Sequence, residues 1–160
     1  VDTVFGDTAG APNTTGDLAR DGSHSDDDEY DVVTAALTVI KSQTVISDPF
    51  NGAVNPKAIP GAVIEYCVDI NNTGATQADA IVMTDAIPAN TTYQLGTIRV
   101  GVAGVGTACT SGTGAAEDDA AAGGGGAGDY NVTTAGAVTV RGGNIAAAAR
   151  YKALFRVTVN

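Results

Sequence analysis

The side chains of this chain that could carry out catalysis are few and lie far apart in the sequence. The only histidine, His24, lies in the polar run SHSDDDE. A catalytic triad or a zinc site needs further side chains that converge on such a histidine. The sequence has no G-x-S-x-G motif, and the glycine run at 123–126 lacks the Lys-Ser/Thr of a phosphate-binding loop. We therefore expect that the protein is not an enzyme.

One acidic run could bind a metal ion. Asp26, Asp27, Asp28 and Glu29 are consecutive, and calcium prefers several carboxylate oxygens. Their spacing is not that of an EF-hand loop, and a run of like charges is more often simply hydrated. Calcium is thus the single cofactor that the sequence suggests, and a solvated acidic run is the alternative.

The two cysteines suggest a disulfide. Cys67 lies in the stretch AVIEYCVDI, where apolar side chains alternate with Glu65, Cys67 and Asp69. Successive side chains of a strand point to opposite faces, so Cys67 shares the charged face, which we expect to be hydrated. Cys109 lies in a Gly/Ala-rich insertion, residues 103–129, that could cross this face. We predict a Cys67–Cys109 bond that fastens the insertion to the outside of the sheet; two unpaired thiols are the alternative.

Lys41 invites a further chemical question, because sandwich domains of surface proteins can form internal isopeptide bonds. Such a bond needs a lysine, an Asn or Asp, and an acid, all on the core face. Lys41 follows Leu37 and Val39 in phase, whereas Glu65 lies on the opposite face of its own strand and cannot act as the proton shuttle. The expectation is a lysine at a strand end whose ammonium group reaches water.

Strands must position these side chains, because no stretch has the apolar period of an amphipathic helix. The turn signals are rich in Pro, Gly and Asn, and Gly142-Gly143-Asn144 is one of them. The insertion 103–129 has no periodicity, which is typical of a flexible loop. Several short alternating strands predict an all-β fold, a β-sandwich over residues 30–160. The runs with strand character are 30–47, 62–70, 78–84, 92–102, 130–141 and 150–159.

Composition narrows the partners. The 160 residues include 8 Lys and Arg against 18 Asp and Glu, a net charge of −10, which argues against nucleic acid and anionic membranes. No run approaches the ~18 apolar residues of a membrane helix. Residues 1–29 are polar except for Val1, Val4 and Phe5, so we expect an extended N-terminal arm that becomes ordered only on what it binds. Since the chain begins with Val1, we also expect a processed, exported form.

A set of spaced residues resembles a known prokaryotic family, the repeat called domain of unknown function 11. The resemblance is clearest over residues 37–101 and extends over 35–160, with the Gly-rich insertion as the departure. It implies an immunoglobulin-like sandwich outside the cell and brings no catalytic motif with it. The residues that carry it are Lys41, Pro60-Gly61, Tyr66, Asn72, Gly74, Asp85, Pro88 and Tyr93, followed by the closing strand FRVTV.

Together these observations predict a structural subunit of an extracellular filament or surface assembly. The subunits would polymerise with themselves by strand addition, in which an extended segment pairs with the sheet edge of a neighbour. Val1, Val4 and Phe5 would anchor the arm, and the segment 30–40, with Val32 and Val33, is an alternative donor. The alternatives are an adhesin-like binding module, whose insertion 103–129 grips a glycan or a host protein, and a spacer domain of a surface protein.

Overall fold

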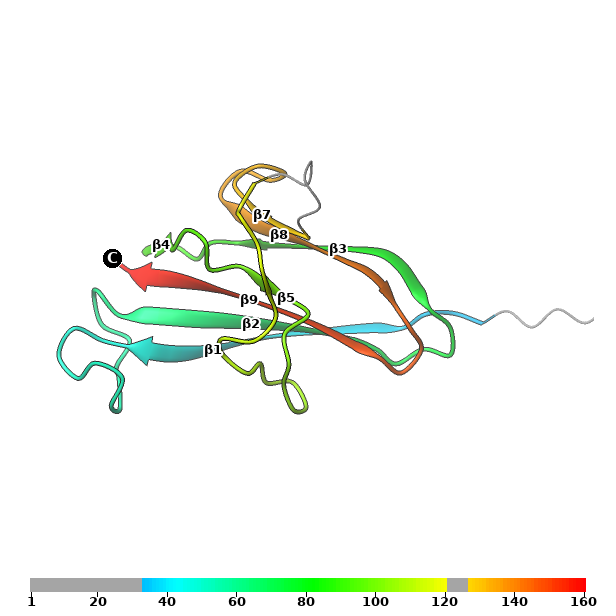
Figure 1. Ribbon diagram of the computed structural model, residues 1–160, viewed down its shortest axis with the longest axis horizontal. Helices are drawn as coiled ribbons and strands as arrows, with labels where there is room; N and C mark the ends of the chain where they lie inside the picture. The colour runs from blue at the N-terminus through cyan, green and yellow to red at the C-terminus, as the bar shows by residue number, and fades with distance from the viewer. Residues whose placement is uncertain (1–32, 121–126) are drawn as a thin grey trace, which may run out of the picture. The chain divides into compact units, whose positions relative to one another are not determined.

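The structure is a computed structural model, and it describes residues 33–120 and 127–160 (Figure 1). These residues form nine β-strands and no helix. Within the described ranges, therefore, no helix is long and apolar enough to cross a membrane. The strands are β1 (Leu37–Ser47), β2 (Val63–Asn72), β3 (Ala78–Ala86), β4 (Thr91–Tyr93), β5 (Arg99–Val100), β6 (Ala115–Ala116), β7 (Gly128–Tyr130), β8 (Ala137–Ile145) and β9 (Arg150–Val159).

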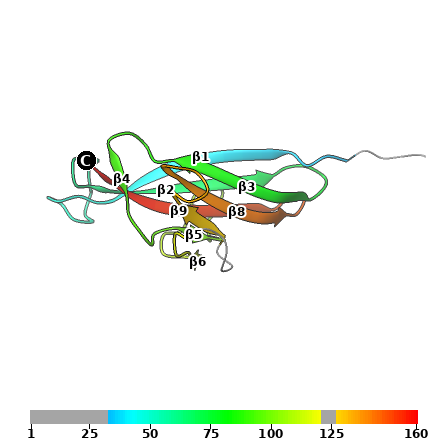
Figure 2. The same ribbon diagram turned by 90° about the horizontal axis from the view of Figure 1, so that it is seen from above.

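The strands form two antiparallel sheets, so the all-β prediction is confirmed at this level. The larger sheet has the order β1-β2-β9-β5-β6, with β4 also paired to β9, and the smaller has the order β3-β8-β7. Figures 1 and 2 show the two sheets lying over each other as in a β-sandwich. Their shared core consists of Ile64, Tyr66, Tyr93, Ile98, Val100, Val138, Val140, Ala153, Phe155 and Val157.

The alternation predicted for the second and last strands is correct. In β2 the side chains of Ile64, Tyr66, Val68 and Ile70 face the core. In β9 every second side chain does the same, and the ring of Phe155 lies 5.5 Å from that of Tyr66 between ring centroids. These central strands pair along their whole lengths, which fixes the register of the larger sheet.

The prediction of one strand over 92–102 is wrong. The chain turns at Gly96, whose φ of +72° is readily adopted only by glycine, so the run divides into β4 and β5. Both short strands pair with β9, β4 through Tyr93 opposite Val157 and β5 through Arg99 opposite Leu154. The run 92–102 therefore supplies two short strands, which pair with two separate stretches of β9.

The predicted strand 130–141 and the turn after it also need correction. β7 ends at Tyr130, and the backbone N–H of Gly136 donates to Asn131 Oδ1 at 2.8 Å, which closes a turn before β8 begins. Gly142-Gly143-Asn144 then lies inside β8 rather than in a turn. The close approach of Tyr151 explains a glycine there, because a Cβ on Gly142 would lie 3.1 Å from Tyr151 Cδ1.

The insertion is more ordered than the predicted flexible loop. Residues 115–116 form β6, which pairs with β5, and β7 begins at Gly128. The segment before β6 is tied to the sheet by the contacts described below. Residues 121–126 and the predicted arm, residues 1–29, lie outside the described residues.

Candidate functional site

The candidate site is a seam where the two sheets end on the same side of the molecule. β1 is the last strand of the larger sheet and β3 the last strand of the smaller one, and each pairs with a single strand in the described part of the chain. The two edge strands lie in different layers, and the salt bridge described below links them. We call this opening between β1 and β3 the seam.

The inner face of β1 is exposed at the seam. Val39 pairs directly with Ile70 of β2, so both side chains point to the same side of the sheet. Ile70 is 3% exposed and belongs to the core, whereas Val39 is 57% exposed. Leu37, two residues earlier on the same face, is exposed as well. Within residues 33–120 and 127–160, therefore, no strand of the smaller sheet covers these two side chains.

The β3 side of the seam is partly apolar too. Ile81 and Met83 are half-buried and pack against the small cluster of Val68, Ile70 and Ile145. The register of β3 with β8 shifts on both sides of Ile81, and the preceding Ala80 has a φ of +52°. This bulge bends the start of β3, while Val82–Ala86 continue as regular strand.

A salt bridge crosses the seam between the two sheets. Lys41 Nζ of β1 lies 2.7 Å from both carboxylate oxygens of Asp85 of β3. The ammonium group also lies 4.3 Å from the centroid of the Tyr66 ring, a cation–π contact. Lys41 is thus turned inward as its phase suggested, but it pairs with an acid instead of only reaching water. Burial and the nearby Asp85 carboxylate raise the pKa of Tyr66 above its ordinary value, which keeps the phenol neutral.

The sequence did not reveal the partner of Lys41. The sequence indicates only that Asp85 lies at the end of its strand, and nothing in it places that strand opposite Lys41. Glu65, the acid considered for an isopeptide bond, lies on the opposite face of the larger sheet, where it accepts from Ser111 Oγ at 2.9 Å. Glu65 is therefore not beside Lys41 and Asp85, and these two residues form an ion pair.

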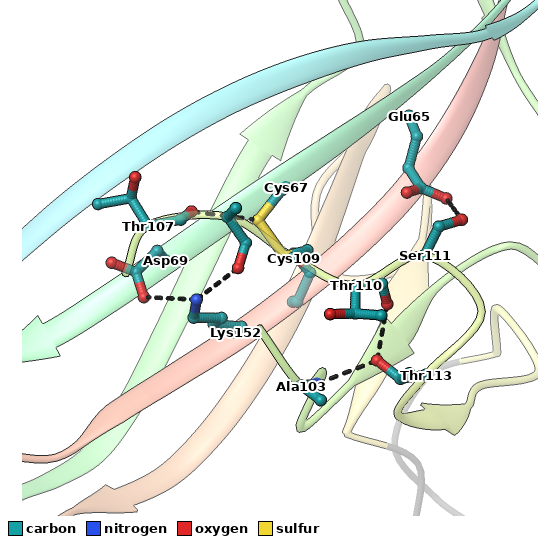
Figure 3. The surroundings of a disulfide bond; sticks show 12 residues. Glu65, Cys67, Asp69, Ala103, Thr107, Cys109, Thr110, Ser111, Thr113 and Lys152 are labelled. Atoms are coloured by element: carbon teal, nitrogen blue, oxygen red, sulfur yellow. Dashed lines mark hydrogen bonds and ion pairs between the residues drawn. A yellow bond between two sulfur atoms is a disulfide. The ribbon is translucent and has the colours of Figure 1, made fainter. Parts of the chain in front are cut away.

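On the outer face of the larger sheet, the structure contains the predicted disulfide. Cys67 of β2 is bonded to Cys109, with 5.8 Å between the two Cα atoms (Figure 3). Cys109 belongs to residues 103–113, which we call the strap. The strap is closed on itself by hydrogen bonds from Thr110 N to Ala103 O, 2.7 Å, and from Ala103 N to Thr113 Oγ1, 3.0 Å.

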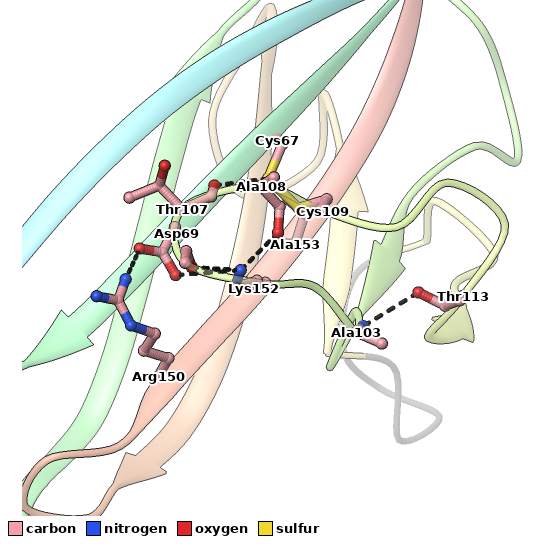
Figure 4. Close-up of polar contacts among 11 residues, drawn as sticks. Cys67, Asp69, Ala103, Thr107, Ala108, Cys109, Thr113, Arg150, Lys152 and Ala153 are labelled. Atoms are coloured by element: carbon pink, nitrogen blue, oxygen red, sulfur yellow. Dashed lines mark hydrogen bonds and ion pairs between the residues drawn. A yellow bond between two sulfur atoms is a disulfide. The ribbon is translucent and has the colours of Figure 1, made fainter.

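The expectation of a hydrated outer face is wrong. Glu65 is 5% exposed and Asp69 is fully buried, because the strap covers them. Arg150 donates to Asp69, and Lys152 Nζ lies 3.8 Å from the same carboxylate (Figure 4). Lys152 Nζ also donates to the backbone oxygens of Gly106 at 2.7 Å and Ala108 at 2.5 Å, so a buried ammonium group holds the strap from below.

Next to the strap lies a shallow basic cleft of about 300 Å³. Arg99 of β5 pairs with Leu154, and Arg156 follows two residues later on the same face of β9. Arg156 Nε donates to Glu65 Oε2 at 2.9 Å, which fixes one of the two guanidinium groups. The cleft is lined by Gly96, Thr97, Arg99, Gly112, Leu154 and Arg156.

The remaining predicted site residues can be placed only in part. Val33, from the alternative donor segment, is described and exposed. Within 33–120 and 127–160, no three His, Cys, Asp or Glu side chains come together as a metal site. The other predicted residues lie outside the described part of the chain: the anchors Val1, Val4 and Phe5, Val32, and the calcium candidates Asp26, Asp27, Asp28 and Glu29.

Comparison with known proteins adds no family to this geometry. The chain matches no family model, and neither curated proteins nor solved structures show a match to it. The resemblance stated from the sequence motifs therefore stays a prediction.

Proposed function

We propose that this chain is the subunit of an extracellular structural polymer, in which the N-terminal arm of one copy adds a strand to the next copy at the seam. The observation that carries the proposal is the contrast between Val39 and Ile70. They share one face and one rung of the ladder, yet only Ile70 is covered. A strand added to the free edge of β3 would lie over Val39 and Leu37 and complete the smaller sheet.

The arm is long enough to be that strand. Residues 1–29 directly precede the segment that leads into β1, and an extended chain of that length spans roughly 95 Å. The 11 residues of β1 span about 37 Å. About 11 extended residues of the arm are therefore enough to cover the seam, and Val1, Val4 and Phe5 near the tip would be its apolar anchors. An arm donated from copy to copy makes a heterologous contact, which produces an open polymer when the rotation between copies does not close.

The disulfide supports the extracellular part of the proposal. Disulfides persist in oxidising surroundings and are rare where thiols are kept reduced. Cys67 and Cys109 are the only cysteines of the chain, and both are used in one bond. An immunoglobulin-like arrangement of the two sheets belongs to the same proposal, through the motif resemblance.

Deleting residues 1–29 tests the proposal. The deletion leaves the seam and the core of the domain intact, so the variant should stay folded and monodisperse under conditions in which the full chain forms polymers. Analytical ultracentrifugation and negative-stain electron microscopy report assembly, and circular dichroism reports folding. A synthetic peptide of residues 1–29 should bind the deleted variant. Polymers of normal appearance from the deleted variant would show that the arm is not the donor.

The basic cleft favours a second candidate function, a binding module for an acidic glycan. Arg99 and Arg156 both line the cleft; Arg156 is paired with Glu65, and the Arg99 guanidinium group could pair with a carboxylate or sulfate group of a ligand. A glycan array that contains acidic and neutral saccharides tests this candidate. Binding that requires an acidic group on the saccharide and that Arg99→Gln abolishes would favour this second function. Equal binding of neutral saccharides would exclude it.

A further inference from the structure

Two exposed apolar groups lie at opposite ends of the described domain. The loop 48–62 joins β1 to β2 and carries Phe50 and Val54, which are 84% and 79% exposed. The segment that leads into β1 carries the exposed Val33. Val33 precedes the start of β1 and the loop follows its end, where Figure 1 shows it, so the 11 residues of β1 separate the two groups within one molecule.

The loop is held in one conformation, which distinguishes it from an ordinary flexible turn. The buried carboxylate of Asp48 accepts from the backbone N–H groups of Phe50 at 2.8 Å, Asn51 at 2.6 Å and Lys57 at 2.6 Å. Asp48 and Gly52 also exchange two backbone hydrogen bonds, at 2.9 and 3.0 Å. The loop therefore presents Phe50 and Val54 without having to be ordered by a partner, which lowers the entropic cost of docking.

The direction of the arm determines what meets this loop in a polymer. This step rests on the proposed function. The arm leaves each domain at the start of β1, so a neighbour of the same polarity gives its arm the shortest path into the seam when its β1 start adjoins the far end of the acceptor domain. That far end is where β1 finishes and where the loop 48–62 lies. The donated arm then runs along the seam toward Leu37 and Val39, and about 11 extended residues cover that length.

We infer that the loop 48–62 is a second interaction surface, which docks on a second copy of this chain. Phe50 and Val54 of one copy contact the segment around Val33 of the next, at the base of the donated arm. The contact is end to end and separate from the seam. It explains why a loop that carries two large exposed apolar side chains is fixed by a buried carboxylate.

The double variant Phe50→Ser/Val54→Ser of the full chain tests this surface, because both side chains are exposed and the fold does not depend on them. Burial of these side chains at each junction predicts that the variant needs at least about tenfold more protein for half of it to sediment as polymer. Val105→Ser is the matched control, since Val105 is an exposed apolar residue on the strap, away from both ends of β1. The control should assemble like the unaltered chain.

A cross-linking experiment locates the contact directly. The photoreactive residue p-benzoylphenylalanine at position 50 should join peptides that contain residues 30–40 of a neighbouring copy in the assembled polymer. Assembly of the double variant at the normal concentration, or cross-links that map elsewhere, would overturn the inference. If deletion of residues 1–29 still abolished assembly in that case, the proposed function would stand and only the second surface would fall. If that deletion left assembly unchanged, the proposed function would fall as well.

Discussion

Removing the disulfide with Cys67→Ala/Cys109→Ala should destabilise the domain and release the strap. The bond closes a loop with a sequence separation of 42 residues. In the chain-entropy treatment a crosslink of this span stabilises the folded state by about 4 kcal/mol. Cys67 is buried, so its replacement also removes some packing against the strap.

The loss should be smaller than that if other contacts keep the strap in place. The two hydrogen bonds from Lys152 and the bond from Ser111 Oγ to Glu65 remain in the variant. We therefore expect the free energy of unfolding to fall by about 2–4 kcal/mol. Backbone amides of the strap should lose protection from hydrogen exchange, while those of β2 and β9 keep theirs.

Urea denaturation without a reducing agent, so that the unaltered chain keeps its disulfide, measures the free energy of unfolding, and hydrogen exchange with mass spectrometry locates the change. Val105→Ser serves as control, because it alters the strap without touching the crosslink. The reasoning would be refuted by a variant that loses less than about 1 kcal/mol and keeps full protection over residues 103–113. That outcome would mean that the polar contacts alone hold the strap.

The remaining predictions concern the charged groups. Lys152→Met should lower the free energy of unfolding by about 2–3 kcal/mol in urea denaturation. The reason is that buried Asp69 loses a charged partner and the strap loses two hydrogen bonds. The control variant Lys57→Met, on the surface, should change the free energy of unfolding little. Asp85→Asn should cost up to about 1 kcal/mol, and thermal unfolding in high salt should show a smaller difference, since Lys41 is partly exposed. Hydrogen bonds from the side chain and then the backbone of Asn51 lower the pKa of Asp48 below its ordinary value of 3.8. The contribution of the Asp48 carboxylate to stability is therefore complete above pH 3.8 and is lost only as the pH falls through the lower pKa of the folded state. The amides of Phe50, Asn51 and Lys57 should thus stay protected from hydrogen exchange at about pH 3. Loss of that protection at a higher pH would contradict the assignment.

The alternation within single strands could be predicted from the sequence, and the contacts between strands largely could not. The core faces of β2 and β9 follow from their apolar period alone. The burial of the opposite face depends on the strap, which has no period. One signal was present: pairing these strands antiparallel sets Glu65 opposite Arg156 and Asp69 opposite Lys152, a charge match that favours this register.

The seam shows the same limit. Leu37 and Val39 have the phase of core residues, and the sequence gives no sign that the smaller sheet stops before covering them. Leu37 and Val39 stay uncovered because the smaller sheet has the order β3-β8-β7 in the described part of the chain, and this order is a property of the whole topology. Lys41 and Asp85 likewise come together only because the edge strands of two different sheets lie side by side.

A helical reconstruction of the assembled full chain by electron cryo-microscopy tests the central claim most directly. The account predicts an additional strand from a neighbouring copy along the free edge of β3, which covers Leu37 and Val39. An empty seam within the polymer, or a seam filled by the arm of the same copy, would contradict it.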